Sequence, residues 1–116
     1  MSSTQSFESV RSPAVASLFY PGNPLELQQN VRELLDEASR DVDLPDERIL
    51  RALIVPHAGY VYSGSTAAKA YRLLNNYRDE FRRIILLGPA HRVWIEGLAF
   101  PGVEAFETPL GRIPLA

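Results

Sequence analysis

Two histidines, His57 and His91, are the residues whose type and spacing most directly suggest chemistry in this sequence. Each follows a short apolar run and a turn that contains proline, and the predicted strands are residues 50–55 and 83–87. Neutral imidazoles bind zinc, iron, copper or nickel, and two of them with one carboxylate form the site of non-haem iron oxygenases. The matched pair predicts a metal site, while the alternative is that each ring is a structural histidine with its own partner. The acids that follow the second histidine are Glu96, Glu104 and Glu107. The spacing favours none of them as a third metal ligand.

A cluster of hydroxyl-bearing residues follows His57, directly before a predicted helix over residues 65–77. The cluster consists of Tyr60, Tyr62, Ser63, Ser65 and Thr66. Hydroxyls and backbone N–H groups at the start of a helix can hold a carboxylate or a phosphate, so the cluster could bind the anionic part of a ligand. A serine that only caps the helix gives the same pattern, and we favour capping for Ser63 or Ser65.

The elements that would position the two histidines form a βαβ unit. The strands 50–55 and 83–87 are rich in apolar residues, as is typical of strands covered on both faces, and the helix 65–77 joins them. Strands joined in this way lie parallel with a right-handed crossover. In open α/β sheets the ligand site lies beyond the carboxyl ends of the strands. Both histidines follow those ends, so we expect their rings to converge at one rim of the sheet.

Outside this unit, the clearest local prediction is a helix that begins at Pro24. Asn23 can cap this helix, and proline is favoured at the first helical position. Its apolar face consists of Leu27, Val31, Leu34, Leu35 and Ala38. Shorter strands are expected at residues 97–100 and 112–115. The acidic stretch 36–47 lacks calcium-loop spacing and is expected to be a solvated helix end and loop.

Length and composition indicate a single globular unit. Of the 116 residues, 1–9 are expected to be disordered and 10–116 to form one α/β domain with a layered sheet and flanking helices. The net charge of −2 gives no electrostatic reason to expect nucleic acid or an anionic membrane as a partner. The chain has no cysteine, no signal-peptide pattern and no apolar run near the ~20 residues of a membrane span. We therefore expect a cytoplasmic protein.

Four segments, in this order, resemble the Memo family, also called AmmeMemoRadiSam system protein B. They are VRSPAVASLFYPG, IVPHAGYVYSG, LLGPAHR and ETPLG, and they cover nearly the whole chain. The resemblance implies a fold similar to that of class III extradiol dioxygenases, with a metal site at the strand ends. Family members are more than twice as long, so it also implies that this chain is the N-terminal part of a larger Memo-like fold. Ser17 stands where the family usually has glycine, and Ala90 where serine is common.

The same resemblance assigns roles to particular residues. His57 and His91 match the family's metal ligands, and Phe19 and Tyr62 match residues that line the same pocket, beside Tyr60 and Ser63. Iron or copper is the implied metal, with zinc as a further candidate, and a third ligand would come from sequence outside this chain. The implied activity is that of a metal-dependent, dioxygenase-like oxidoreductase acting on a small molecule. The alternative is a signalling module that binds a peptide or a phosphorylated side chain in that pocket.

Overall fold

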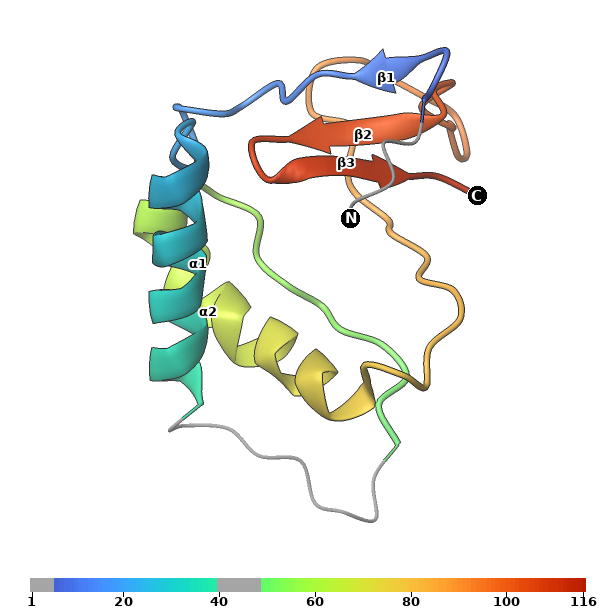
Figure 1. Cartoon of the computed structure of the whole chain (residues 1–116). Helices are drawn as coiled ribbons and strands as arrows, with labels where there is room; N and C mark the ends of the chain where they lie inside the picture. The colour runs from blue at the N-terminus through green and yellow to red at the C-terminus, as the bar shows by residue number, and fades with distance from the viewer. Residues whose placement is uncertain (1–5, 40–48) are drawn as a thin grey trace.

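The computed structural model describes residues 6–39 and 49–116, and these form a mixed α/β fold (Figure 1). The elements in chain order are β1 (Val10–Arg11), α1 (Pro24–Ala38), α2 (Tyr60–Tyr71), the 3-10 helix η1 (Arg72–Tyr77), β2 (Ala105–Thr108) and β3 (Gly111–Pro114). The two helices pack on one another at one side of the molecule, and the small sheet lies at the other (Figure 1). The predicted α/β class is confirmed.

Helix α1 forms as the sequence predicts. The Asn23 side chain accepts hydrogen bonds from the backbone N–H groups of Leu25, at 2.9 Å, and Glu26, at 3.1 Å. These bonds satisfy two of the donors that the first turn of a helix leaves free. The predicted apolar face is also the covered face, with Leu27 and Ala38 buried and the other three members half-buried.

Helix α2 begins five residues before the predicted start. Tyr60, Tyr62 and Ser63 therefore lie in its first turn and not in a loop before it, which corrects that expectation. The earlier start is possible because the Tyr60 N–H donates to the Phe19 carbonyl at 2.7 Å, which satisfies a first-turn donor without a side-chain cap. Gly64 is buried where α2 meets Leu34 of α1, so the absence of a side chain there lets the helices approach closely.

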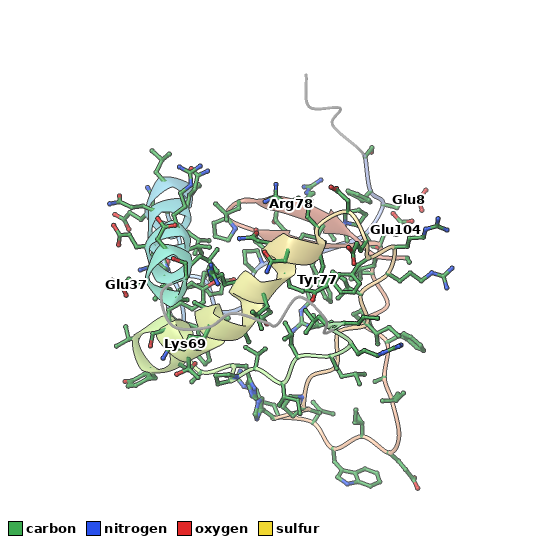
Figure 2. The ribbon with its side chains drawn as sticks, turned by 90° about the horizontal axis from the view of Figure 1, so that it is seen from below. Glu8, Glu37, Lys69, Tyr77, Arg78 and Glu104 are labelled. Carbon is green, nitrogen blue, oxygen red and sulfur yellow. The ribbon has the colours of Figure 1, made fainter. Side chains whose placement is uncertain are left out.

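The sheet has the order β1-β2-β3, with β1 and β2 parallel and β2 and β3 antiparallel. The β2–β3 turn is closed by Thr108, whose Oγ1 accepts from the Leu110 N–H at 3.1 Å and donates to the Gly111 carbonyl at 3.2 Å. The chain before β1 is attached to the chain before β2, because the Glu8 N–H donates to a Glu104 carboxylate oxygen at 2.8 Å (Figure 2). Strand β3 corresponds, one residue earlier, to the strand predicted at 112–115.

Three other predicted strands are wrong. Residues 50–55, 83–87 and 97–100 form no strand, so the parallel βαβ pair is absent from the described part of the chain. A strand needs hydrogen-bonding partners on a neighbouring strand, and the described residues offer none to these runs. Their apolar side chains are correspondingly exposed, as with Ile54 at 100% and Phe100 at 93%.

The arm between β1 and α1 contains the one non-glycine residue of the described chain with a positive φ. This residue is Ser17, with φ of 67°, and it occupies the position where the resemblance expects glycine. The left-handed region is unfavourable for residues with a Cβ atom, which explains a preference for glycine at this point.

Some expectations fall on other parts of the chain. The first five residues and the acidic residues within 40–48 lie outside the described residues. Across the described ranges, no helix combines the length and the apolar character that crossing a membrane requires.

Candidate metal centre

The structure brings His57 and His91 together. Their Nε2 atoms are 3.0 Å apart, their ring centroids are separated by 5.2 Å, and the ring planes are inclined by 42°. The two residues are 34 positions apart in sequence, and both side chains are exposed. The predicted convergence of the rings is therefore observed, although the strands that were expected to cause it do not form.

Two chemical interpretations fit this contact. In the first, one Nε2–H donates to the other Nε2, since neutral imidazole carries one donor and one acceptor nitrogen. In the second, both nitrogens face a single cation. Two ligands each about 2.05 Å from one ion are 3.0 Å apart when they subtend an angle of about 94° at that ion. This is close to the right angle between neighbouring ligands of an octahedral site, so the donor pair fits a metal.

The pair is not joined by a third ligand within the described part of the chain. No group of three or more His, Cys, Asp or Glu side chains there could hold a metal ion. Glu104 is engaged elsewhere with the Glu8 N–H, and Glu107 accepts from Arg112 Nε at 3.4 Å. The described residues thus offer two nitrogen ligands on an open surface.

The loop that carries His57 is fixed on its C-terminal side, where it joins α2. Ser63 Oγ donates to the Ala58 carbonyl at 3.2 Å, and the Ser63 N–H donates to the Gly59 carbonyl at 3.1 Å. Ser63 therefore ties the histidine loop to α2. The predicted helix cap by Ser63 or Ser65 is wrong, because α2 has no side-chain cap and the Ser63 hydroxyl donates to a carbonyl instead of accepting from a first-turn N–H group.

Phe19 and Tyr62 border the same loop. A Cβ atom placed on Gly59 would lie 3.5 Å from the Phe19 carbonyl oxygen and 3.8 Å from Tyr62 Cδ2. Tyr62 is 87% exposed and Phe19 44% exposed, so both aromatic rings are accessible beside the histidine loop. These are the two aromatic residues that the family resemblance assigns to the pocket.

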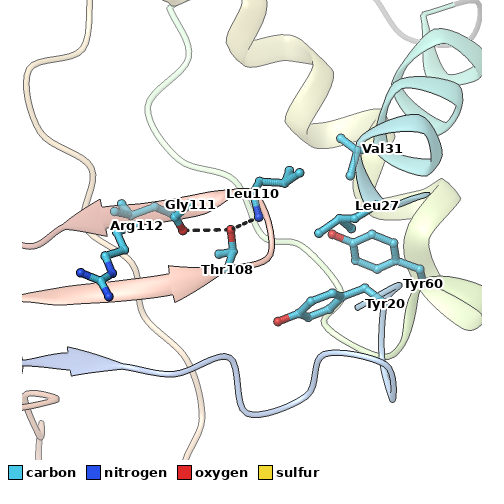
Figure 3. A pocket seen from close by; sticks show the side chains of 9 residues that line it. Tyr20, Leu27, Val31, Tyr60, Thr108, Leu110, Gly111 and Arg112 are labelled. Carbon is cyan, nitrogen blue, oxygen red and sulfur yellow. Dashed lines mark hydrogen bonds between the residues drawn. The ribbon is translucent and has the colours of Figure 1, made fainter. Parts of the chain in front are cut away.

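Tyr60 points elsewhere. Its ring centroid lies 5.7 Å from that of Tyr20, and both rings line a cavity of about 410 Å³ between α1 and the β2–β3 turn (Figure 3). Burial raises the pKa of the Tyr60 hydroxyl above its usual value, and the neighbouring Tyr20 and Tyr71 raise it further.

The cavity was not predicted from the sequence. The residues of ETPLG that line it are Thr108, Leu110 and Gly111, and this motif was noted only as part of the family resemblance. The cavity depends on α1, α2 and the hairpin meeting in space, so no local pattern indicates it.

Comparison with known proteins places these motifs in context. The family model described as "Memo-like protein" matches residues 11–115. The "Protein memo-1 homolog" of Caenorhabditis elegans is 38% identical over 91% of this chain and 28% of its own length. A "MEMO1 family protein" of Aquifex aeolicus is 34% identical over 91% of this chain and 36% of its own length. A "MEMO1 family protein" of Thermococcus onnurineus is 38% identical over 90% of this chain and 34% of its own length. The chain spans about a third of the length of these relatives, and no solved structure matches it.

Proposed function

This chain belongs to the Memo-like protein family, and from that premise we propose that it carries part of a metal site, with His57 and His91 as two of the ligands. The metal is iron or copper, with zinc as the further candidate. The site serves a dioxygenase-like oxidoreductase that acts on a small molecule.

One observation carries the proposal, the 3.0 Å separation of the two Nε2 atoms. These are the only histidines of the chain, and they come from segments far apart in sequence. A separation that suits two neighbouring ligands needs no rearrangement before a metal binds, and metal sites tolerate little error in ligand position.

The residues around the pair have definite tasks in this proposal. His57 and His91 hold the ion, and a bound iron or copper ion would supply Lewis-acid and one-electron chemistry. The hydrogen bonds of Ser63 hold the His57 loop against α2. The exposed rings of Phe19 and Tyr62 provide apolar surface beside the histidines on which a substrate can be oriented.

Metal content tests the ligand assignment. The wild-type chain, His57→Ala and His91→Ala are loaded with iron(II) without oxygen, or with copper(II), desalted, and analysed for bound metal. Loss of one of two ligands should weaken binding by at least about 100-fold, since even changes to groups behind the ligands cost 10–100-fold. The Ser65→Ala chain is the matched control, because Ser65 is exposed on α2 and should leave binding unchanged. Equal metal in all variants would remove the assignment.

A second function is favoured by the exposed aromatic rings. Phe19, Tyr62 and the two imidazoles would form a surface that binds a peptide or a phosphorylated side chain without catalysis, because aromatic faces and imidazole N–H donors suit such ligands. Calorimetric titration with matched phosphorylated and plain tyrosine peptides tests it. Tighter binding of the phosphorylated peptide that is lost in Tyr62→Ala supports this function, and equal heats for both peptides argue against it.

A further inference from the structure

The cavity between α1 and the β2–β3 turn is separate from the histidine pair, because neither His57 nor His91 lines it. Its walls come from the arm before α1, from α1 itself, from the first turn of α2 and from the hairpin (Figure 3). Its volume of about 410 Å³ lies within the roughly 300–1,000 Å³ of pockets that bind small molecules. The cavity is therefore large enough for a small organic molecule, and the metal proposal gives it no task.

The wall of this cavity is mainly apolar. Its aliphatic lining residues are Leu27, Val31, Leu110 and Ile113. Two of its polar side chains are already engaged within the hairpin. Thr108 Oγ1 makes both of the bonds that close the turn, and Arg112 Nε lies 3.4 Å from a carboxylate oxygen of Glu107. The polar side-chain groups that remain for a ligand are the hydroxyls of Tyr20 and Tyr60.

These two hydroxyls have no hydrogen-bonding partner within residues 6–39 and 49–116, although the backbone of both tyrosines is held in place. The Ser17 N–H donates to the Tyr20 carbonyl at 2.7 Å. The Tyr60 N–H donates to the Phe19 carbonyl, also at 2.7 Å. Figure 3 shows both hydroxyl oxygens directed toward the β2–β3 turn. Each phenolic hydroxyl can donate one hydrogen bond, so the pair suits a ligand that brings an acceptor oxygen.

The wall favours a neutral ligand over an anion. Burial raises the pKa of the Tyr60 hydroxyl, which means that this part of the wall already disfavours a negative charge. An anionic ligand would lose its hydration against aliphatic side chains, and that loss is costly without a charge partner. Arg112 carries the one positive charge of the lining, and Glu107 already balances it.

We propose that this cavity binds a neutral small molecule with an apolar body and a carbonyl oxygen, and that the hydroxyls of Tyr20 and Tyr60 donate hydrogen bonds to it. The aliphatic residues of the wall cover the apolar body of the ligand. A carbonyl oxygen has two lone pairs and can accept from both hydroxyls. This inference goes beyond the metal proposal and does not depend on it.

Three probes of similar shape test the proposal. Acetophenone carries a neutral carbonyl, α-methylstyrene has a CH₂ group in place of that oxygen, and benzoate has a charged oxygen in place of the methyl group. Binding to the isotope-labelled chain is followed by NMR through the backbone amide signals of Leu110 and Gly111, which line the cavity. We expect acetophenone to bind at least about fivefold more tightly than either of the other probes, as the gain of one hydrogen bond implies.

Three tyrosine variants locate the binding. Tyr20→Phe and Tyr60→Phe remove the hydroxyls and keep the rings, so each should weaken acetophenone binding about fivefold and leave α-methylstyrene binding unchanged. Tyr77→Phe is the matched control, because Tyr77 lies in η1 and does not line the cavity. It should bind acetophenone as the wild type does.

The proposal is overturned if acetophenone leaves the amide signals of Leu110 and Gly111 unchanged. It is also overturned if α-methylstyrene or benzoate binds as tightly as acetophenone, because neither a carbonyl nor neutrality would then matter. A third contrary result is that Tyr20→Phe and Tyr60→Phe have no larger effect than Tyr77→Phe. His57→Ala should bind acetophenone normally, so this proposal and the metal proposal can fail independently.

Discussion

Metal binding should stabilise the wild-type chain against heat, and should do so only when both histidines are present. A ligand that binds only the folded state at 100 times its dissociation constant adds about 2.7 kcal/mol to the free energy of unfolding. The entropy of unfolding near the midpoint is about 2.1 cal/mol/K per residue, or about 0.24 kcal/mol/K for 116 residues. Dividing the first quantity by the second gives a rise in melting temperature of about 11 °C.

The assay is thermal unfolding followed by circular dichroism, with and without zinc(II) or copper(II), and with a chelator as the reversal control. His57→Ala and His91→Ala remove exposed side chains and leave no cavity. Without metal, each should therefore unfold within about 0.5 kcal/mol, or about 2 °C, of the wild type. With metal, neither should approach the wild-type rise.

Two results would refute this reasoning. An equal rise in the wild type and both variants would mean that the metal binds elsewhere. No rise in the wild type, combined with a lower melting temperature of both variants in the absence of metal, would mean that the 3.0 Å contact is a hydrogen bond between imidazoles and not a pair of ligands.

Three further predictions concern stability. Ser17→Gly should raise the free energy of unfolding by about 1 kcal/mol, measured by urea unfolding, because it relieves a φ of 67°; an unchanged midpoint would contradict the strain. Gly64→Ala should lower that free energy by about 1 kcal/mol. The new Cβ atom would lie 3.2 Å from Leu34 Cδ1 and 3.3 Å from Tyr60 Cβ, and this overpacking, roughly 1–3 kcal/mol, outweighs the roughly 1 kcal/mol that alanine gains over glycine inside a helix. Gly59→Ala, with its nearest contact at 3.5 Å, should change the free energy of unfolding by less than about 0.5 kcal/mol. The raised pKa of Tyr60 means that the folded state holds the hydroxyl proton more tightly than the unfolded state does. The free energy of unfolding should therefore be intact below the ordinary tyrosine pKa and fall as pH rises through the raised value. Tyr60→Phe should remove this contribution to the fall, and a pH profile of stability that Tyr60→Phe leaves unaltered would exclude the contribution.

The features that the sequence predicts well are those with local causes. Asn23 caps α1 because its side chain reaches donors two and three residues ahead, and the spacing of apolar residues fixes which face of α1 is covered. The start of α2 was placed too late for the opposite reason. The Tyr60 N–H is satisfied by the carbonyl of Phe19, 41 positions earlier in the chain, and no local pattern indicates that bond.

The histidine pair shows a correct outcome reached through an incorrect intermediate. We expected the rings to meet because they follow two parallel strands, yet neither strand forms in the described chain. What fixes the His57 loop is the set of bonds made by Ser63 and Tyr60 at the start of α2. The segment before His91 has no comparable support among the described residues, and a Cβ atom on Gly88 would touch nothing within 4 Å.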